Sequence, residues 1–454
     1  MPIDPIHLTV WTMAVAAFMV PLLRFTPANR RTTVLAWTLV GVAAYAAKHL
    51  LIVALPQWTD APSDASGYVA HAEALFLHWN AAPVDPDAYR LAGYSQHWAA
   101  AHGRFWAPHA QIPYASVLGT SEWLYSALLA QHLPIGPAWP AWATGTNLLI
   151  AAMLPAASWL LAIELGADRM GAAAAAALMA IDPTTSVNAS WLLKDVFTTA
   201  VAALALLAAC HLLRRVSLQA MLILTLTLAV LVATRFVGFL AIACTLVGLF
   251  LIGVVQRDKP RWTPLVAVGL SLVAATGIAA YPLAPDHAQV VDTLLGRFDA
   301  ANATMMAGAG ERAFDPSVSE WWSRLKDNPL LAMLQAVART LFAPYPWSVL
   351  QSPLTWDNHL ELYLLGSLVW LLCLPPIGIG LVQAAQRRSL SDLLCLGTVF
   401  ALTIAYILMM GEWSTRQRAF MNPLFFAFFG LGLMQVKRWL SVHRPDSKAK
   451  VAYG

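Results

Sequence analysis

Two aspartates begin the segment whose residue types and spacing best suit catalysis. Asp60 and Asp64 directly follow a long apolar segment and precede a stretch that we predict to be a helix running to about His78. A carboxylate fixed at a helix start can act as a general base or bind a cation. The alternative is that Asp64 only caps this helix, since Asp is among the preferred residues at helix N-termini. Both interpretations of Asp64 stay open on spacing alone.

Basic residues form a second set that could do chemistry. We expect five of them at or near the ends of apolar segments, on the same side as Asp64: Lys194, Arg235, Arg339, Arg416 and Arg418. Charged groups beside hydrocarbon are costly, so they usually face a cavity or pair with a neighbour. Arginine suits a phosphate through its planar fork, and lysine supplies a point charge. The structural alternatives are an ion pair of Lys194 with Asp195 and snorkelling of Arg235 to the interface.

The elements that must position these residues are membrane helices. Of the 454 residues, 59% are hydrophobic and only 11% are charged, whereas soluble domains carry about 25% charged residues. The apolar residues form long blocks instead of the short alternating segments of a β-barrel. The predicted fold class is therefore an all-α integral membrane protein, a polytopic helical bundle of about eleven spans with outer loops and interfacial helices.

The order of apolar blocks and basic turns predicts the topology. We expect spans near residues 7–23, 33–55, 141–165, 171–187, 195–213, 217–233, 237–255, 263–283, 360–384, 391–410 and 421–436. Lys and Arg concentrate in the short turns of one side and in the tail 437–454, which makes that side cytoplasmic. The N-terminus and the long loops 56–140 and 284–359 then lie outside. Residues 1–436 form a single transmembrane domain, in which 329–343 is an interfacial or re-entrant helix.

Several segments in this order resemble the GT-C superfamily of membrane glycosyltransferases, which includes the bacterial protein mannosyltransferase and lipid A aminoarabinose transferase families. The run from Asp64 through Tyr68 to Ala72 is similar to the first outer-loop motif of that superfamily. The likeness continues through these segments: Trp123–Tyr125, Asp182-Pro183, Lys194-Asp195 and Thr234-Arg235-Phe236. It covers roughly residues 60–255, and its weight comes from the order and topology of the segments.

The resemblance implies an inverting glycosyltransferase that moves a sugar from a polyprenyl-phosphate carrier to a cell-envelope acceptor. The acceptor would be a glycan, a lipid or a protein, at the periplasmic face of a bacterial inner membrane, and no nucleic acid is involved. Asp64 would be the general base and Asp60 the second candidate. The phosphate leaves, so cationic groups must stabilise its growing charge. The implied substrate-binding residues are Tyr68, Lys194, Asp195, Arg235, Arg416 and Arg418.

Metal ligands are not evident in the sequence. The outer loops contain no clear second acidic cluster, and their carboxylates are scattered over Asp292, Asp299, Glu311 and Asp315. His97 and His102 are five residues apart, which is not the spacing of one helix face. We predict no zinc site. Because some members of the superfamily use a divalent cation, whether Mg²⁺ or Mn²⁺ takes part stays open.

Two other functions fit a polytopic membrane protein. A lipid-linked oligosaccharide polymerase or ligase also uses outer arginines, but its donor is normally a pyrophosphate and its large loop comes late in the chain. A transporter usually places polar residues in mid-span and has repeated halves. The early acidic loop and the nearly uncharged spans favour the glycosyltransferase over both.

Overall fold

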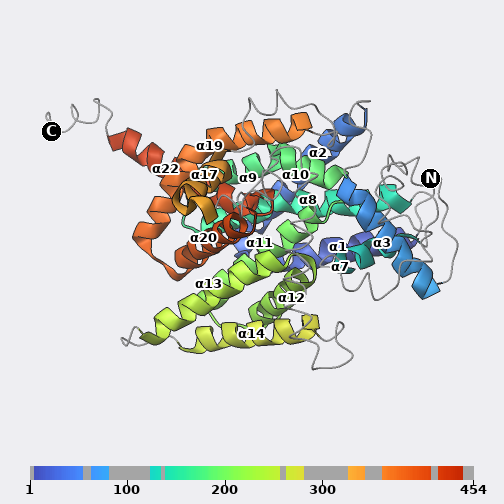
Figure 1. Ribbon diagram of the computed structural model, residues 1–454, viewed down its shortest axis with the longest axis horizontal. Helices are drawn as coiled ribbons and strands as arrows, with labels where there is room; N and C mark the ends of the chain where they lie inside the picture. The colour runs from blue at the N-terminus through green and yellow to red at the C-terminus, as the bar shows by residue number, and fades with distance from the viewer. Residues whose placement is uncertain are drawn as a thin grey trace.

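The computed structural model is a bundle of α-helices (Figure 1). The structure describes residues 5–54, 63–80, 123–133, 139–255, 262–280, 326–342, 360–410 and 418–442. Within these ranges the regular elements are helices, and no β-strand occurs. The predicted all-α fold class is confirmed.

The helices follow the apolar blocks of the sequence. In chain order the elements are α1 (Pro5–Arg24), η1 (Ala28–Arg30), α2 (Arg31–Ala54), α3 (Ser63–Asn80), α7 (Trp123–Ala130), α8 (Trp139–Glu164), α9 (Arg169–Ile181), α10 (Pro183–Ser190), α11 (Lys194–Arg214), α12 (Leu218–Thr234), α13 (Phe236–Val255), α14 (Trp262–Ala280), α17 (Pro329–Phe342), α19 (Leu360–Arg387), α20 (Leu390–Met410) and α22 (Asn422–Val442). A helix overlaps each of the predicted spans.

Five stretches among the described residues are long and apolar enough to cross a membrane. They are Ala28–Ala54, Trp139–Glu164, Lys194–Arg214, Leu365–Arg387 and Leu390–Ile407. Further apolar helices, such as Leu218–Thr234 and Phe236–Ile252, are shorter. The protein is thus a multi-pass membrane protein, whereas the count of eleven spans stays a prediction.

The predicted span 171–187 is wrong as a continuous helix. α9 ends at Ile181, and α10 begins at Pro183, the first position of the new helix. The side chain of Asp182 accepts a hydrogen bond from the backbone N–H of Thr185 at 2.9 Å and so caps α10. Pro183 lacks the N–H that a continuing helix would need, but it is well suited to a helix start. The break turns Asp182 toward the interior of the bundle, where it is buried.

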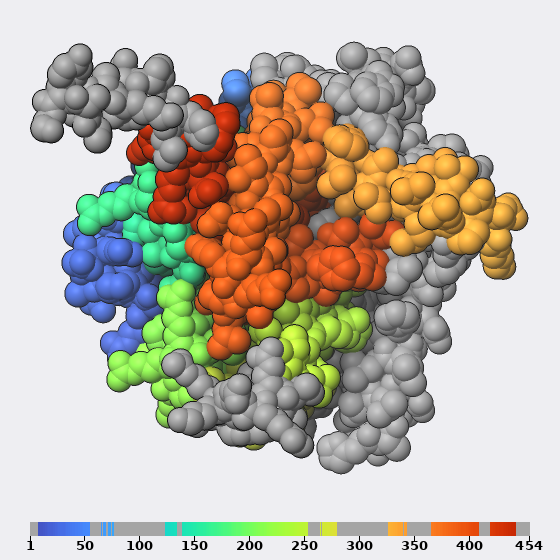
Figure 2. Space-filling model, turned by 90° about the vertical axis from the view of Figure 1, so that its left-hand side faces the viewer, coloured from blue at the N-terminus to red at the C-terminus, as the bar shows by residue number. Residues whose placement is uncertain are grey.

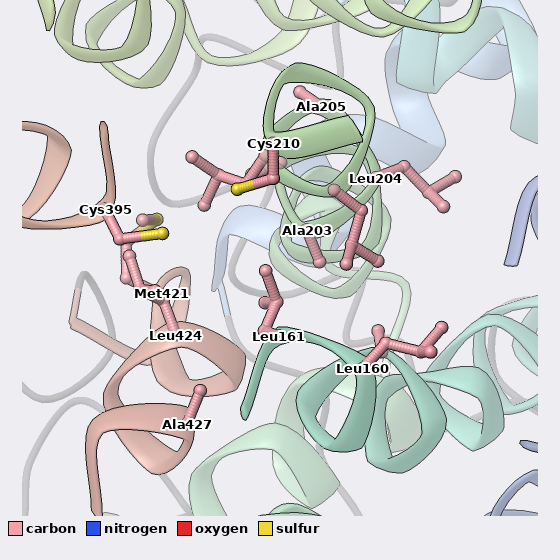
Figure 3. Packing of buried hydrophobic residues seen from close by; sticks show 14 of the residues in the cluster. Leu160, Leu161, Ala203, Leu204, Ala205, Cys210, Cys395, Met421, Leu424 and Ala427 are labelled. Atoms are coloured by element: carbon pink, nitrogen blue, oxygen red, sulfur yellow. The ribbon is translucent and has the colours of Figure 1, made fainter. Parts of the chain in front are cut away.

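The centre of the bundle is formed by α8 and α11, which pack against each other and against their neighbours α2, α9, α12 and α22. Leu160 and Leu161 of α8 face Ala203 and Leu204 of α11 in this core (Figure 3). Small residues bring the backbones close elsewhere. A Cβ atom added to Gly171 of α9 would overlap the carbonyl oxygen of Gly430 of α22. This is the close approach that glycine permits between membrane helices.

Helices of the two predicted outer loops lie at the margins of this bundle. α3 confirms the helix predicted after Asp60 and packs with α7 at the right-hand end of Figure 1. A separate apolar cluster joins these two helices to the start of α11, through residues such as Tyr68, Tyr125 and Trp191. α17 confirms the predicted helix at 329–343 and projects from the edge of the molecule in Figure 2.

Candidate functional site

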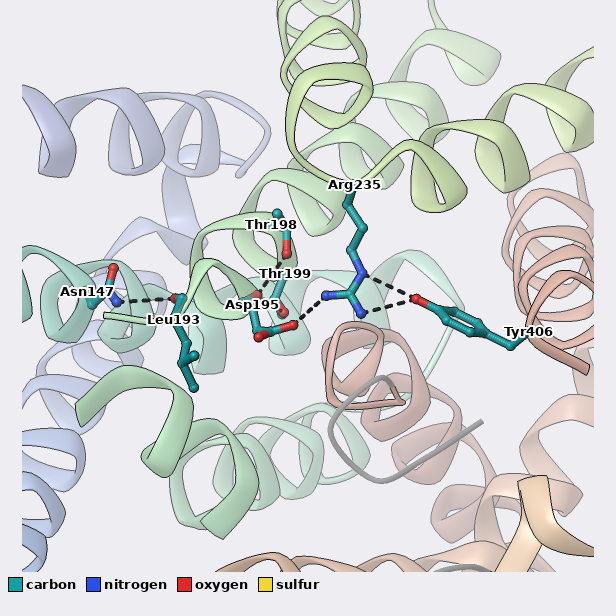
Figure 4. Close-up of polar contacts among 7 residues, drawn as sticks. All are labelled: Asn147, Leu193, Asp195, Thr198, Thr199, Arg235 and Tyr406. Carbon is teal, nitrogen blue, oxygen red and sulfur yellow. Dashed lines mark hydrogen bonds and ion pairs between the residues drawn. The ribbon is translucent and has the colours of Figure 1, made fainter. Parts of the chain in front are cut away.

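A buried ion pair lies where α11 begins and α12 meets α13. Nη1 of Arg235 donates to Oδ1 of Asp195 at 2.5 Å, and the two side chains are only 11% and 5% exposed (Figure 4). Nε and Nη2 of the same guanidinium donate to the hydroxyl oxygen of Tyr406, at 3.3 and 3.1 Å. The guanidinium carbon also lies 4.7 Å from the ring centroid of Phe420. Four helices therefore converge on one arginine.

The pairing decides what Arg235 can do. Burial opposes the charge of Arg235, but Tyr406 and Asp195 outweigh that effect and raise the pKa of the guanidinium. Its charge is matched by a carboxylate at contact distance, so little of it remains for a phosphate. The structural alternative expected for Arg235 does not occur here. Arg235 does not snorkel to the interface but forms an ion pair with Asp195.

The first outer helix reaches the same region through a cation–π contact. Nζ of Lys194 lies 5.7 Å from the centroid of the Tyr68 ring, within the range in which a ring face attracts a cation. Tyr68 in turn packs edge-on against Tyr125, with the ring centroids 5.5 Å apart. The structure thus brings Tyr68 of α3 next to the start of α11, as the predicted site requires.

The two candidate bases are only partly placed. Asp64 lies in the first turn of α3, one turn before Tyr68. Its side chain lies outside the described residues, as do Asp60 and Arg416 as a whole. Their catalytic and binding roles stay predictions.

Arg418 has a very different environment from Arg235. It is 2% exposed, and its guanidinium carbon lies 4.1 Å from the ring centroid of Trp370. Nη1 donates to the backbone oxygen of Thr340 at 3.3 Å, whereas Nη2 is buried with no hydrogen-bond partner among the described residues. Burial lowers the pKa of Arg418 to about 9, so the group keeps its charge at neutral pH. A buried charge with so few partners strongly favours an anionic ligand.

A small pocket adjoins this guanidinium. It is lined by Asp182, Thr184, Gly366, Trp370, Arg418, Asn422 and Phe426. Oδ2 of Asp182 accepts hydrogen bonds from the Thr185 backbone and from Nδ2 of Asn422, the latter at 3.0 Å. Nζ of Lys48 donates to the backbone oxygen of Ala180 at 2.6 Å, beside the same turn. Oδ2 of Asp182 therefore already has partners, whereas Nη2 of Arg418 is buried with spare hydrogen-bonding capacity.

The sequence did not single out three members of this pocket as site residues. In the sequence, Asp182 stands out only as part of the Asp182-Pro183 pair, which can mark a helix break but indicates no binding role. Trp370 lies in the middle of an apolar run and looks there like any other core or interface aromatic. Asn422 follows the Arg-x-Arg motif by four residues, a position that by itself indicates no contact with Asp182.

Metal ligation receives no support from the part of the chain that is described. No group of three or more His, Cys, Asp and Glu side chains comes together there. Involvement of Mg²⁺ or Mn²⁺ stays open, because most of both long outer loops lies outside the described ranges.

Comparison with solved structures identifies the architecture. The Archaeoglobus fulgidus oligosaccharyltransferase in its apo form superposes with a TM-score of 0.54 and 15% identity, over 93% of this chain and 53% of that one. The chain has the GT-C fold. The expected resemblance is confirmed at this level, since identities this low show the fold alone.

Two further structures from Archaeoglobus fulgidus agree. The oligosaccharyltransferase complex with Zn and sulfate matches with a TM-score of 0.50 at 15% identity, over 90% of this chain and 49% of that one. AglB in complex with an inhibitory peptide and a dolichol-phosphate matches with a TM-score of 0.53 at 14% identity, over 93% of this chain and 52% of that one. This chain thus spans about half the length of the structures that it matches. No protein-family model matches its sequence, and neither does any curated protein.

Proposed function

We propose that this protein is a glycosyltransferase of a bacterial inner membrane, with its active site at the periplasmic face. It would transfer a sugar, with inversion, from a polyprenyl-phosphate carrier to an envelope glycan, lipid or protein. The GT-C fold supports glycosyl transfer in general terms. The single observation that best supports a phosphate-linked donor is Arg418, a charged, buried guanidinium with an unpartnered Nη2 at a pocket.

The proposed reaction needs a base and a cation. Asp64, or failing it Asp60, would accept the proton of the acceptor's hydroxyl or amine group. The acceptor oxygen or nitrogen then forms a bond to the anomeric carbon from the face opposite the carrier. The bond between that carbon and the phosphate oxygen breaks, and the polyprenyl phosphate leaves with the electron pair. Arg418 would stabilise the charge that grows on this phosphate.

The other candidate residues would hold the two substrates and their surroundings. Lys194 and Tyr68 line the place where α3 meets α11, so they are suited to the sugar or its phosphate. Arg416 would add a second cation beside Arg418. Arg235 and Asp195 are matched to each other, so we assign them the role of positioning residues and no longer that of direct substrate ligands.

The archaeal complexes support this choice of ligands. One neighbour was solved with a dolichol-phosphate and an inhibitory peptide, and another with Zn and sulfate. Dolichol-phosphate belongs to the same chemical class as the proposed carrier, and a peptide is one of the proposed acceptor classes. A divalent cation stays open for the present chain.

The test is a transfer assay in membranes with a polyprenyl-phosphate sugar. Asp64→Asn keeps a side chain that can cap α3 but removes the base, so it separates catalysis from capping. We expect its rate to fall about 100-fold or more. Asp168→Asn is the matched control, because Asp168 caps the start of α9 through the N–H of Gly171, at the other end of that helix from Asp182. Full activity of both Asp64→Asn and Asp60→Asn refutes the proposed function. Activity only with a diphosphate-linked donor favours the polymerase or ligase.

A further inference from the structure

α17 packs on the bundle through its small residues and turns its large ones away. Ala332, Ala336 and Thr340 follow at four-residue intervals and are buried, and the two alanines contact Ile407 of α20. Leu330 and Leu334 lie on the opposite side and are 72% and 60% exposed. A contact made by two methyl groups buries little apolar area, so among the described residues this side of α17 is held only weakly to α20.

The C-terminal end of α17 is attached differently. The last carbonyls of an α-helix have no partner within the helix and carry its partial negative charge. Two of them are satisfied from the bundle. Nη1 of Arg418 donates to the oxygen of Thr340 at 3.3 Å, and Nε1 of Trp370 donates to the oxygen of Leu341 at 2.9 Å. Arg418 and Trp370 therefore act together as the cap of α17.

The cavity beside Arg418 is too small for a phosphate. The pocket beside Arg418 has a cavity volume of about 10 Å³, roughly the space that one water molecule needs. A phosphate brings four oxygens and a lipid chain, so it does not fit this cavity, whose walls come from α10, α19, α22 and Arg418. The negatively polarised carbonyl of Thr340 holds the position in which an anionic oxygen would bind.

We propose that α17 is a gate whose C-terminal turn occupies Arg418 until the phosphate of a polyprenyl-phosphate lipid displaces it. The inference rests on the proposed function and adds the step that admits the donor. A phosphate oxygen carries a full charge and binds arginine more strongly than a neutral carbonyl does. The exchange breaks the hydrogen bonds from Arg418 to Thr340 and from Trp370 to Leu341, and it gives Nη2 of Arg418 a partner that it lacks in the capped state.

The experiment uses a cysteine on the buried side of α17 in the full-length protein. Ala336→Cys is introduced together with Cys244→Ala, which removes the one exposed native cysteine among the described residues. The rate of maleimide labelling is measured with no ligand, with undecaprenyl phosphate and with inorganic phosphate. We expect slow basal labelling and a rise of about tenfold or more with the lipid phosphate. Leu334→Cys is the matched control, because its position is exposed whether or not the gate opens.

A second variant tests the cap itself. Trp370→Phe keeps an aromatic ring under Arg418 but removes the hydrogen bond to Leu341. Loss of one such bond should raise the basal labelling of the cysteine at position 336 about two- to tenfold. Binding of undecaprenyl phosphate is measured independently by native mass spectrometry.

The outcomes separate the gate from the function. Lipid phosphate that binds without changing the labelling at position 336 overturns the gate and leaves the proposed function intact. If inorganic phosphate raises the labelling rate at position 336 as much as the lipid phosphate does, the proposal that the lipid opens the gate is refuted. Absence of binding to the wild-type protein overturns both proposals.

Discussion

Removal of the carboxylate of Asp195 should destabilise the whole outer half of the bundle. Asp195→Asn keeps the shape of the side chain and an amide oxygen that can accept from Nη1, but it removes the negative charge and leaves Arg235 as a buried cation with only neutral partners among the described residues. Breaking a buried ion pair by removing one partner costs about 3–5 kcal/mol. Tyr406→Phe removes only two long hydrogen bonds to the same guanidinium and should cost about 1.5 kcal/mol. The order of the two effects is the first test.

The double variant Asp195→Asn with Arg235→Met gives the sharper result. It removes both charges together, so we expect it to be more stable than Asp195→Asn alone, although it contains one more substitution. The assay is thermal unfolding of the detergent-solubilised protein, with Asp168→Asn as a control for a carboxylate outside the pair. If Asp195→Asn unfolds at the temperature of the control, or if the double variant loses the sum of the single effects, the ion pair is not what stabilises this region.

Two further predictions concern Arg418 and the glycine contacts. Arg418→Met should abolish binding of polyprenyl phosphate but leave the unfolding temperature unchanged or raised, because it removes a buried charge with few partners; a loss of stability as large as that of Asp195→Asn would contradict this. Gly171→Ala should destabilise the protein by about 1–3 kcal/mol in the same unfolding assay, since its Cβ would overlap the backbone of Gly430. Gly378→Ala is the matched control, with no atom within 4 Å of the added Cβ, and equal unfolding of the two variants would refute the close approach.

The sequence predicted the positions of the helices well, because a membrane helix depends on local composition. Long apolar blocks between basic turns are sufficient to locate α8 or α11, whatever the partners of these helices are. The break at Asp182 was missed for a local reason. An Asp-Pro pair can either end a span at the membrane surface or begin a new helix inside the bundle. Which of the two occurs depends on whether the carboxylate finds hydrogen-bond partners elsewhere in the chain. Its partner Asn422 is 240 residues away.

The partners of the arginines could not be predicted, for the same reason. Arg235 and Arg418 both follow an apolar helix or precede one, and the sequence suggested the same role for both. The difference between them comes from long-range contacts. Asp195 and Tyr406 reach Arg235 from α11 and α20, whereas Arg418 meets an aromatic ring and one carbonyl.

The two arginines are nevertheless part of one arrangement. The guanidinium of Arg235 lies against the ring of Phe420, only two residues after Arg418. Phe420 fits there because Gly238 has no side chain, and a Cβ atom at Gly238 would overlap the ring. The ion pair therefore helps to fix the short segment that carries Arg418. Arg418 can keep an unpartnered Nη2 only if its backbone is held in place. If the segment that carries Arg418 and Phe420 were flexible, the guanidinium would turn toward a carboxylate and pair with it. It follows that Asp195→Asn should weaken donor binding as well as stability, without either Asp195 or Arg235 touching the donor.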